Sequence, residues 1–160
     1  MADYSYVTVT VEDTPVNRGI LENWAERLGD VYLDSFVVTG EDGAPVALVQ
    51  AVVEEARYGF PDMAYEGTGD NDVRKLLNAL MDAGIAWEGY DGGGYEWPET
   101  AYAWWPGGAV RRQLLDGTGE PVLTLGQWRW ILNGIAHPDS YGAAEVVEAV
   151  ERHFQPLALW

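Results

Sequence analysis

The chain has 160 residues and carries 26 Asp and Glu against 9 Lys and Arg, which gives a formal net charge of −17 at pH 7. Direct binding to nucleic acid is therefore excluded as a function, because contact with phosphates requires clustered Lys and Arg. Hydrophobic residues make up 48% of the chain and cysteine is absent, so we expect a folded domain without disulfides, thiolate nucleophiles or Cys-ligated metal.

The N-terminal part of the chain predicts a strand followed by a helix. Residues 4–11, YSYVTVTV, alternate polar with β-branched or aromatic side chains, which is the period of a half-buried strand. Thr14 as N-cap, Pro15 at the first helical position and Gly29 beyond the last turn then delimit a helix over 15–28. The apolar face of this helix consists of Ile20, Leu21, Trp24 and Leu28.

The next segment predicts a hairpin, a helix and a strand. β-branched residues fill 31–39 and 46–53, and the six residues between these runs include the turn-forming pair Asp-Gly and a proline. Asp72 is a suitable N-cap for a helix that ends before Gly84, and a strand is expected over 85–90.

The C-terminal part predicts three more strands and two helices. A strand over 100–105 precedes a hairpin with arms 110–115 and 121–125 around Asp116-Gly117-Thr118-Gly119. Thr124 and Gln127 have the spacing of a capping box for a helix that stops at Gly134, and Ser140 caps a final helix over 143–153.

These elements predict an α+β fold in a single domain over 1–160, with a mainly antiparallel sheet and about four helices. The first ninety residues have the order strand, helix, strand, strand, helix, strand, which is the ferredoxin-like plan (βαββαβ). A subdivision would separate this unit, residues 1–90, from a hairpin and two helices in 91–160.

Acidic residues dominate the middle of the chain. Between residues 28 and 73 ten acids accompany a single base, Arg57. The ten are Asp30, Asp34, Glu41, Asp42, Glu54, Glu55, Asp62, Glu66, Asp70 and Asp72. Because they are interleaved with core-forming residues, a folded surface must display them. Self-repulsion of such a surface opposes folding, so we expect it to serve binding; the alternative is a general adaptation of solubility in a saline cytoplasm.

The segment 87–105 combines seven aromatic residues with four acids and no base. Aromatic rings beside carboxylates suit a cationic partner, since both attract Arg and Lys. Tyr90, Tyr95 and Trp97 lie next to glycines and a proline and are expected to face solvent, whereas Trp87, Tyr102 and Trp104 are expected in the core. A platform that stacks sugar rings is a further interpretation of the same residues.

Catalytic patterns are missing from the sequence. It has no Gly-x-Ser-x-Gly, no His-Glu-x-x-His and no phosphate loop with its Lys, and the acids around Asp70 do not complete a calcium loop. The two histidines, His137 in a turn and His153 near a helix end, are expected to be structural. We therefore expect no catalytic residue, no metal and no cofactor.

In charge, size and lack of cysteine, the whole chain resembles the acidic DNA-mimic inhibitors that phages and plasmids direct against restriction or CRISPR systems. These inhibitors share no motif, so no residue role is carried over from them. The resemblance implies a non-catalytic protein, in the cytoplasm of the host cell, that inhibits a defence or DNA-processing protein by binding its basic nucleic-acid-binding surface. No direct contact with nucleic acid or membrane is expected.

The residues expected to contact such a partner are the acids of the middle segment and the aromatic loop. They are Asp30, Asp34, Glu41, Asp42, Glu54, Glu55, Asp62, Glu66, Asp70, Tyr90, Asp91, Tyr95, Glu96, Trp97 and Glu99. The alternative function is an acidic aromatic binding module for a cationic peptide or small ligand, in which segment 87–105 carries the affinity. An enzyme that works through paired carboxylates is a third hypothesis.

Overall fold

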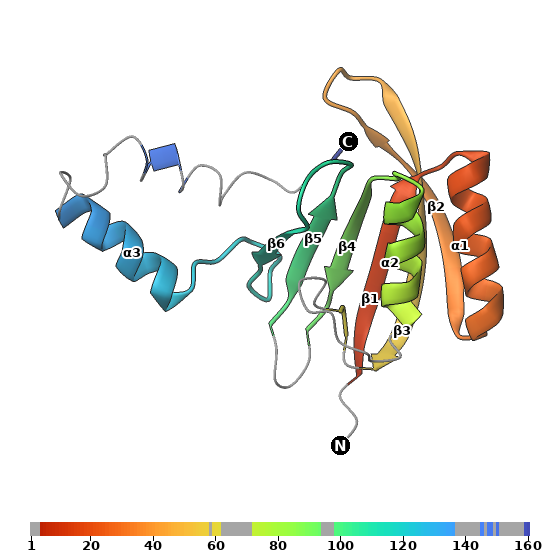
Figure 1. Cartoon of the computed structure of the whole chain (residues 1–160), viewed down its shortest axis with the longest axis horizontal. Helices are drawn as coiled ribbons and strands as arrows, with labels where there is room; N and C mark the ends of the chain where they lie inside the picture. The colour runs from red at the N-terminus through yellow and green to blue at the C-terminus, as the bar shows by residue number, and fades with distance from the viewer. Residues whose placement is uncertain are drawn as a thin grey trace.

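The computed structural model describes residues 4–57, 59–61, 72–93, 98–136, 145, 147, 148, 150, 159 and 160, with the backbone alone at 134–136. Its elements in chain order are β1, α1, β2, β3, α2, β4, β5, β6 and α3 (Figure 1). The predicted α+β class is confirmed, since the described residues form one antiparallel sheet of six strands together with three helices.

The first strand and helix form where the sequence predicts them. β1 spans Tyr4–Glu12 and α1 spans Pro15–Leu28. The hydroxyl of Thr14 accepts a hydrogen bond from the N–H of Asn17 at 3.2 Å, so the first turn of α1 is capped. Gly29 has a φ of 77° and donates its N–H to the carbonyl of Ala25, which ends the helix.

The predicted hairpin is also present. β2 spans Val31–Thr39, and β3 spans Pro45–Arg57 and is longer than expected. In the turn, Asp42 accepts the N–H of Ala44 at 3.0 Å and Gly43 has a φ of 78°, a conformation that glycine adopts without strain.

The next helix and two strands match the prediction to within two residues. α2 spans Asp72–Asp82, β4 spans Trp87–Asp91 and β5 spans Thr100–Trp104. The boundary expected at residue 90 thus falls inside β4, which pairs with β1 on one side and with β5 on the other.

The second predicted hairpin is much reduced. β6 spans Arg111–Leu114, and in place of a second arm the structure has a single bridge between Leu115 and Pro121. On either side of this bridge Val122 donates its N–H to Leu114 and Asp116 donates its N–H to Glu120, so the pairing is confined to the residues next to the turn. In the turn, the carboxylate of Asp116 accepts the N–H groups of Thr118 and Glu120.

The third helix, α3, spans Leu125–Ala136. Its capping box is confirmed, because Gln127 donates its N–H to the Thr124 hydroxyl and returns an acceptor to the Thr124 N–H. The helix continues through Gly134, where we predicted its end; a glycine inside a helix costs only about 1 kcal/mol. Figure 1 shows α3 apart from the sheet. Most of the predicted helix 143–153 lies outside the described residues, so the expected number of four helices is not confirmed.

The strand order is β2-β3-β1-β4-β5-β6, and all neighbours are antiparallel. The core lies on the sheet face to which Val7, Val9 and Val11 of β1 point, and there Leu21 of α1 and Leu77 of α2 pack against them. Among the described helices, α1 and α2 cover this face and α3 contacts neither face extensively. We call the opposite side of the sheet the helix-free face.

Candidate functional site

The candidate site begins with acids of the β2–β3 hairpin. All of these carboxylates are exposed, and none forms an ion pair with another described residue. We call them the hairpin acids: Asp30, Asp34, Glu41, Asp42, Glu54 and Glu55. The structure thus places six of the predicted contact residues on one supersecondary unit.

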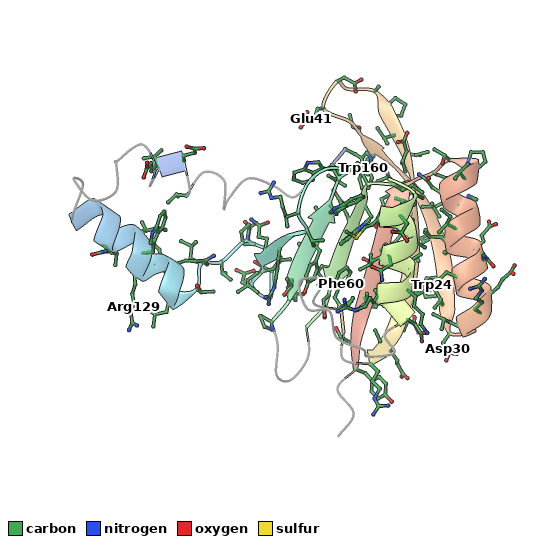
Figure 2. The ribbon with its side chains drawn as sticks, viewed as in Figure 1. Trp24, Asp30, Glu41, Phe60, Arg129 and Trp160 are labelled. Carbon is green, nitrogen blue, oxygen red and sulfur yellow. The ribbon has the colours of Figure 1, made fainter. Side chains whose placement is uncertain are left out.

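The hairpin acids do not form one cluster. Eight strand steps separate Val31 from Thr39, which corresponds to about 27 Å. Glu41 and Asp42 occupy the turn at one end, whereas Asp30 lies at the other end, as the labels of Glu41 and Asp30 show in Figure 2. The sequence could not show this separation, because it depends on the length of the paired strands.

Three tyrosines lie on the helix-free face and form what we call the tyrosine row. Tyr32 of β2 pairs with Val52, Val52 pairs with Thr8, and Thr8 pairs with Tyr90 of β4. Directly paired residues point to the same face of a sheet, so these side chains follow one line across four strands. Tyr6 stands next to this line on β1. Tyr6 is 41% exposed and Tyr32 is 47% exposed, and Tyr90 is half-buried.

A β-bulge brings carboxylates to the tyrosine row. The register shifts between Ser5, which pairs with Ala56, and Val7, which pairs with Val53. Two residues of β3, Glu54 and Glu55, therefore stand opposite the single residue Tyr6 of β1. The bulge joins one end of the hairpin acids to the exposed tyrosines.

The neighbouring tyrosine and acids affect the titration of Tyr32. Burial, followed by the proximity of Tyr6, Glu54 and Asp34, raises the pKa of Tyr32. A hydrogen bond between Tyr6 and Tyr32 adds to this effect. The Tyr32 phenol therefore stays neutral at physiological pH, beside carboxylates that attract a cation.

Tyr90, one of the predicted anchors, is held by a partner. Its hydroxyl donates to Glu99 Oε1 at 2.6 Å. Burial and this hydrogen bond raise the pKa of Tyr90 to about 12. Glu99 Oε2 is buried and has no hydrogen-bond partner in the described part of the chain. Tyr90 is thus the end of the tyrosine row at β4, and its hydroxyl is already bound by Glu99.

Asp91, also predicted as a contact residue, is instead part of the interior. It is 2% exposed. Its carboxylate accepts the hydroxyl of Ser5, the N–H of Phe60 at 2.7 Å and the N–H of Gly93 at 2.8 Å. These bonds hold three separate segments together, so a partner cannot touch Asp91, and we omit it from the candidate site.

Other predicted site residues lie outside the described residues. They are Asp62, Glu66, Asp70, Tyr95, Glu96 and Trp97, and the two histidines, His137 and His153, lie there as well. Their proposed roles stay predictions.

The aromatic segment 87–105 contributes mainly to the core. Trp87 is fully buried and Trp104 is 7% exposed, as predicted. Tyr102 is half-buried and stacks on Phe60 with ring centroids 4.0 Å apart. Trp105 is exposed, and the guanidinium of Arg111 lies over its ring at 5.7 Å. This ring already binds a cation of its own chain.

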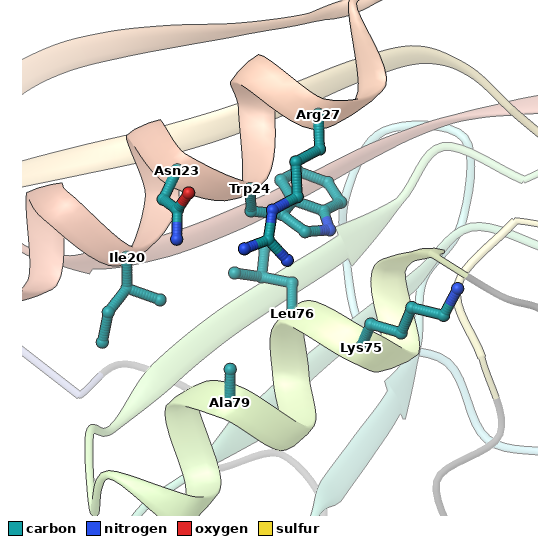
Figure 3. A pocket seen from close by; sticks show the side chains of 7 residues that line it. All are labelled: Ile20, Asn23, Trp24, Arg27, Lys75, Leu76 and Ala79. Atoms are coloured by element: carbon teal, nitrogen blue, oxygen red, sulfur yellow. The ribbon is translucent and has the colours of Figure 1, made fainter.

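A shallow groove between α1 and α2 is a feature that sequence reasoning missed (Figure 3). Its volume is about 210 Å³, and its floor is apolar. The lining residues are Ile20, Asn23, Trp24, Arg27, Lys75, Leu76 and Ala79. Its two charged side chains are both cations, so the groove does not suit the cationic ligand that the acidic surface attracts.

Within the described residues, no group of three His, Asp or Glu could hold a metal ion, and no described helix is long and apolar enough to cross a membrane. No known protein family, curated protein or solved structure matches the chain. The candidate site therefore stands on its geometry: exposed hairpin acids joined through a β-bulge to a row of tyrosines.

Proposed function

We propose that this is a non-catalytic acidic protein that binds the basic nucleic-acid-binding surface of a defence or DNA-processing protein and inhibits it. The observation that carries this proposal is the set of six hairpin acids, all exposed and none neutralised by a described cation. A cytoplasmic location, in the host cell of a phage or plasmid, accords with the cysteine-free chain.

The charge spacing supports partial mimicry of one DNA strand. The six acids extend over about 30 Å, or about one per 5 Å, whereas a DNA strand carries one phosphate per ~3.4 Å of axis. The hairpin thus offers a lower but comparable line of negative charge. A groove lined with Arg and Lys would be attracted to it at long range, which increases the association rate.

The tyrosine row supplies side chains that can lengthen the lifetime of the complex. Exposed carboxylates are strongly hydrated and each contributes little to the lifetime of a complex. Tyrosine is among the preferred anchors of protein interfaces, and its ring attracts Arg and Lys. Tyr6 and Tyr32 are accessible and lie beside Glu54, so an Arg that reaches this point meets two rings and a carboxylate together.

The test is affinity capture on the immobilised protein from a cell lysate at low salt, followed by elution with short duplex DNA. We expect nucleic-acid-binding proteins to be retained and then displaced by DNA, because DNA and the hairpin compete for one groove. A neutral polymer should displace nothing. Proteins that are retained but not displaced by DNA would contradict the proposed mechanism.

Charge reversal locates the contact. The two ends of the hairpin are farther apart than the Debye length of ~10 Å at 0.1 M salt, so they should act independently. We expect E41K/D42K and E54K/E55K each to weaken binding on the order of tenfold and the quadruple variant to combine both losses. The matched control is E26K/D82K, which makes the same change in net charge on α1 and α2. Equal losses in all three double variants would refute a localised site.

A second candidate is a binding module for a cationic peptide or small ligand centred on the tyrosine row. The contact between Tyr6, Tyr32 and Glu54 favours it. Binding dominated by ring stacking loses little affinity when salt screens distant charges, whereas binding to the whole hairpin loses affinity steeply. A salt titration of the captured partner therefore separates the two functions.

For the fold, we interpret residues 4–91 as a ferredoxin-like unit. The order β2-β3-β1-β4 with two helices on one face supports this interpretation. On the helix-free face of this unit Tyr6 and Tyr32 are exposed, whereas Thr8 and Val52 are buried.

A further inference from the structure

The outer edge of β2 is an open edge of the sheet. β2 pairs with β3 through nine consecutive residue pairs, from Val31–Val53 to Thr39–Pro45, without a register shift. The strand contains no proline, glycine or lysine, the residues that commonly protect an edge. At the other side of the sheet, β6 has four residues. The long regular edge therefore belongs to β2.

The backbone groups that point outward follow from the hairpin hydrogen bonds. Gly40 donates its N–H to the carbonyl of Ala44, so this is a hydrogen-bonded pair. From there, hydrogen-bonded and non-hydrogen-bonded pairs alternate along the hairpin, and residues of the non-hydrogen-bonded pairs direct their backbone groups outward. The carbonyl of Ala47 accepts the N–H of Asp13, so it points away from β2, as the alternation requires. Leu33, Ser35 and Val37 consequently direct their N–H and C=O groups away from β3.

These outward groups have no hydrogen-bond partner among the described residues. Val37 is 65% exposed, which shows that its side of the edge is accessible. Arg18 reaches the Ser35 hydroxyl, but this cation is already paired with Asp13 at 2.6 Å. The edge thus presents a row of free donors and acceptors to any extended chain.

Charge decides which chain fits this edge. Asp34 lies in the middle of β2, Asp30 precedes the strand, and Glu41 and Asp42 follow it. A second copy paired edge to edge would bring these carboxylates together with those of its own β2. An extended Lys- and Arg-rich segment would instead place cations beside them.

We propose that β2 takes up an extended basic segment of the partner protein as a seventh strand. The inference rests on the proposed function and specifies how part of the partner binds. Ladder hydrogen bonds at Leu33, Ser35 and Val37 hold the segment, and the hairpin acids select its charge.

The test uses a short peptide of alternating Lys and Thr as the probe, with the same peptide N-methylated throughout its centre as the matched control. Both peptides carry the same charge, but the methylated one cannot donate ladder hydrogen bonds. We expect the methylated peptide to bind the native protein at least about tenfold more weakly at low salt. Amide exchange of the bound native protein should slow at Leu33, Ser35 and Val37.

The protein variant for this test is Val37→Pro, which removes one outward N–H and leaves every β2–β3 hydrogen bond in place. Val37→Thr keeps the N–H and the branched side chain and is its control. We expect V37P, and not V37T, to lose about tenfold in affinity for the unmethylated peptide.

The outcomes are separable. Equal binding of both peptides, without slower exchange at the three amides, refutes strand addition and leaves the proposed function standing. Failure of both peptides to bind contradicts the proposed function as well. A native dimer that V37P converts to a monomer would assign the edge to a second copy and overturn the basic segment as its occupant.

Discussion

Replacing the buried carboxylate of Asp91 with the methyl group of alanine is expected to destabilise the protein by about 4 kcal/mol. The substitution removes the acceptor of the N–H groups of Phe60 and Gly93 and of the Ser5 hydroxyl. The hydroxyl has another acceptor, the carbonyl of Gly93 at 3.1 Å, so the two N–H groups account for most of the loss.

The magnitude follows from burial. A buried donor without a partner costs about 1–3 kcal/mol, so two such N–H groups cost about 2–6 kcal/mol. The total stability of a domain is about 5–15 kcal/mol, so the loss is a large part of it. For a chain of this size, 4 kcal/mol corresponds to a decrease in Tm of about 8–16 °C.

The assay is urea unfolding followed by tryptophan fluorescence, compared with thermal unfolding. Asp116→Ala is the matched control, because this carboxylate also accepts backbone N–H groups but does so in an exposed turn, where water can replace it. We expect it to cost no more than about 1 kcal/mol. A loss below about 1 kcal/mol for D91A, or equal losses for both variants, would refute the argument from burial.

Three further predictions concern the same face and core. Gly89→Ala should lower the free energy of unfolding in urea by about 1–3 kcal/mol, because its Cβ would lie 2.4 and 2.5 Å from ring carbons of Phe60. Replacing that ring by the smaller side chain in Phe60→Leu should recover part of the lost stability. The pKa of Tyr90 is raised to about 12, whereas the value in the unfolded chain is near 10, so the unfolded state releases its proton first and the free energy of unfolding should fall from pH 10 to 12. Tyr90→Phe should reduce the slope of unfolding free energy against pH, and an unchanged slope would contradict this prediction. Burial raises the pKa of Glu88, so its charge opposes folding at pH values above the pKa of the unfolded chain. Glu88→Gln keeps an acceptor for the backbone N–H that Glu88 binds, so this variant should unfold at an equal or higher urea concentration at pH 7. A clear loss of stability would show that the charge itself is required.

Local chemistry made much of the fold predictable. The helix at 15–28 follows from three residues in or next to it, Thr14, Pro15 and Gly29, and the reciprocal cap of Thr124 and Gln127 was visible as a spacing. Where prediction was wrong, a non-local or competing effect decided. Gly134 did not end its helix, and the second hairpin is reduced to one bridge.

The candidate site was predictable only in its composition. Alternation in β1 places Tyr6 on the side of Thr8, away from the valines. Tyr32 lies beside Tyr6 because β3 lies between β1 and β2 and because of the bulge at Glu54 and Glu55. Neither feature can be recognised in the local sequence.

Asp91 was also misplaced by local sequence, since we predicted an exposed contact residue and the structure buries it. Its neighbours in the sequence are loop-forming glycines and a tyrosine, which favoured an exposed position. Its actual hydrogen-bond partners include Ser5 and Phe60, which are distant in the chain. The amino-acid sequence established the net charge, the periodicities and the caps, because these depend on residues a few positions apart. The tertiary structure decided which carboxylates face solvent together and which one is buried, because side-chain direction is local whereas the identity of the neighbour is not.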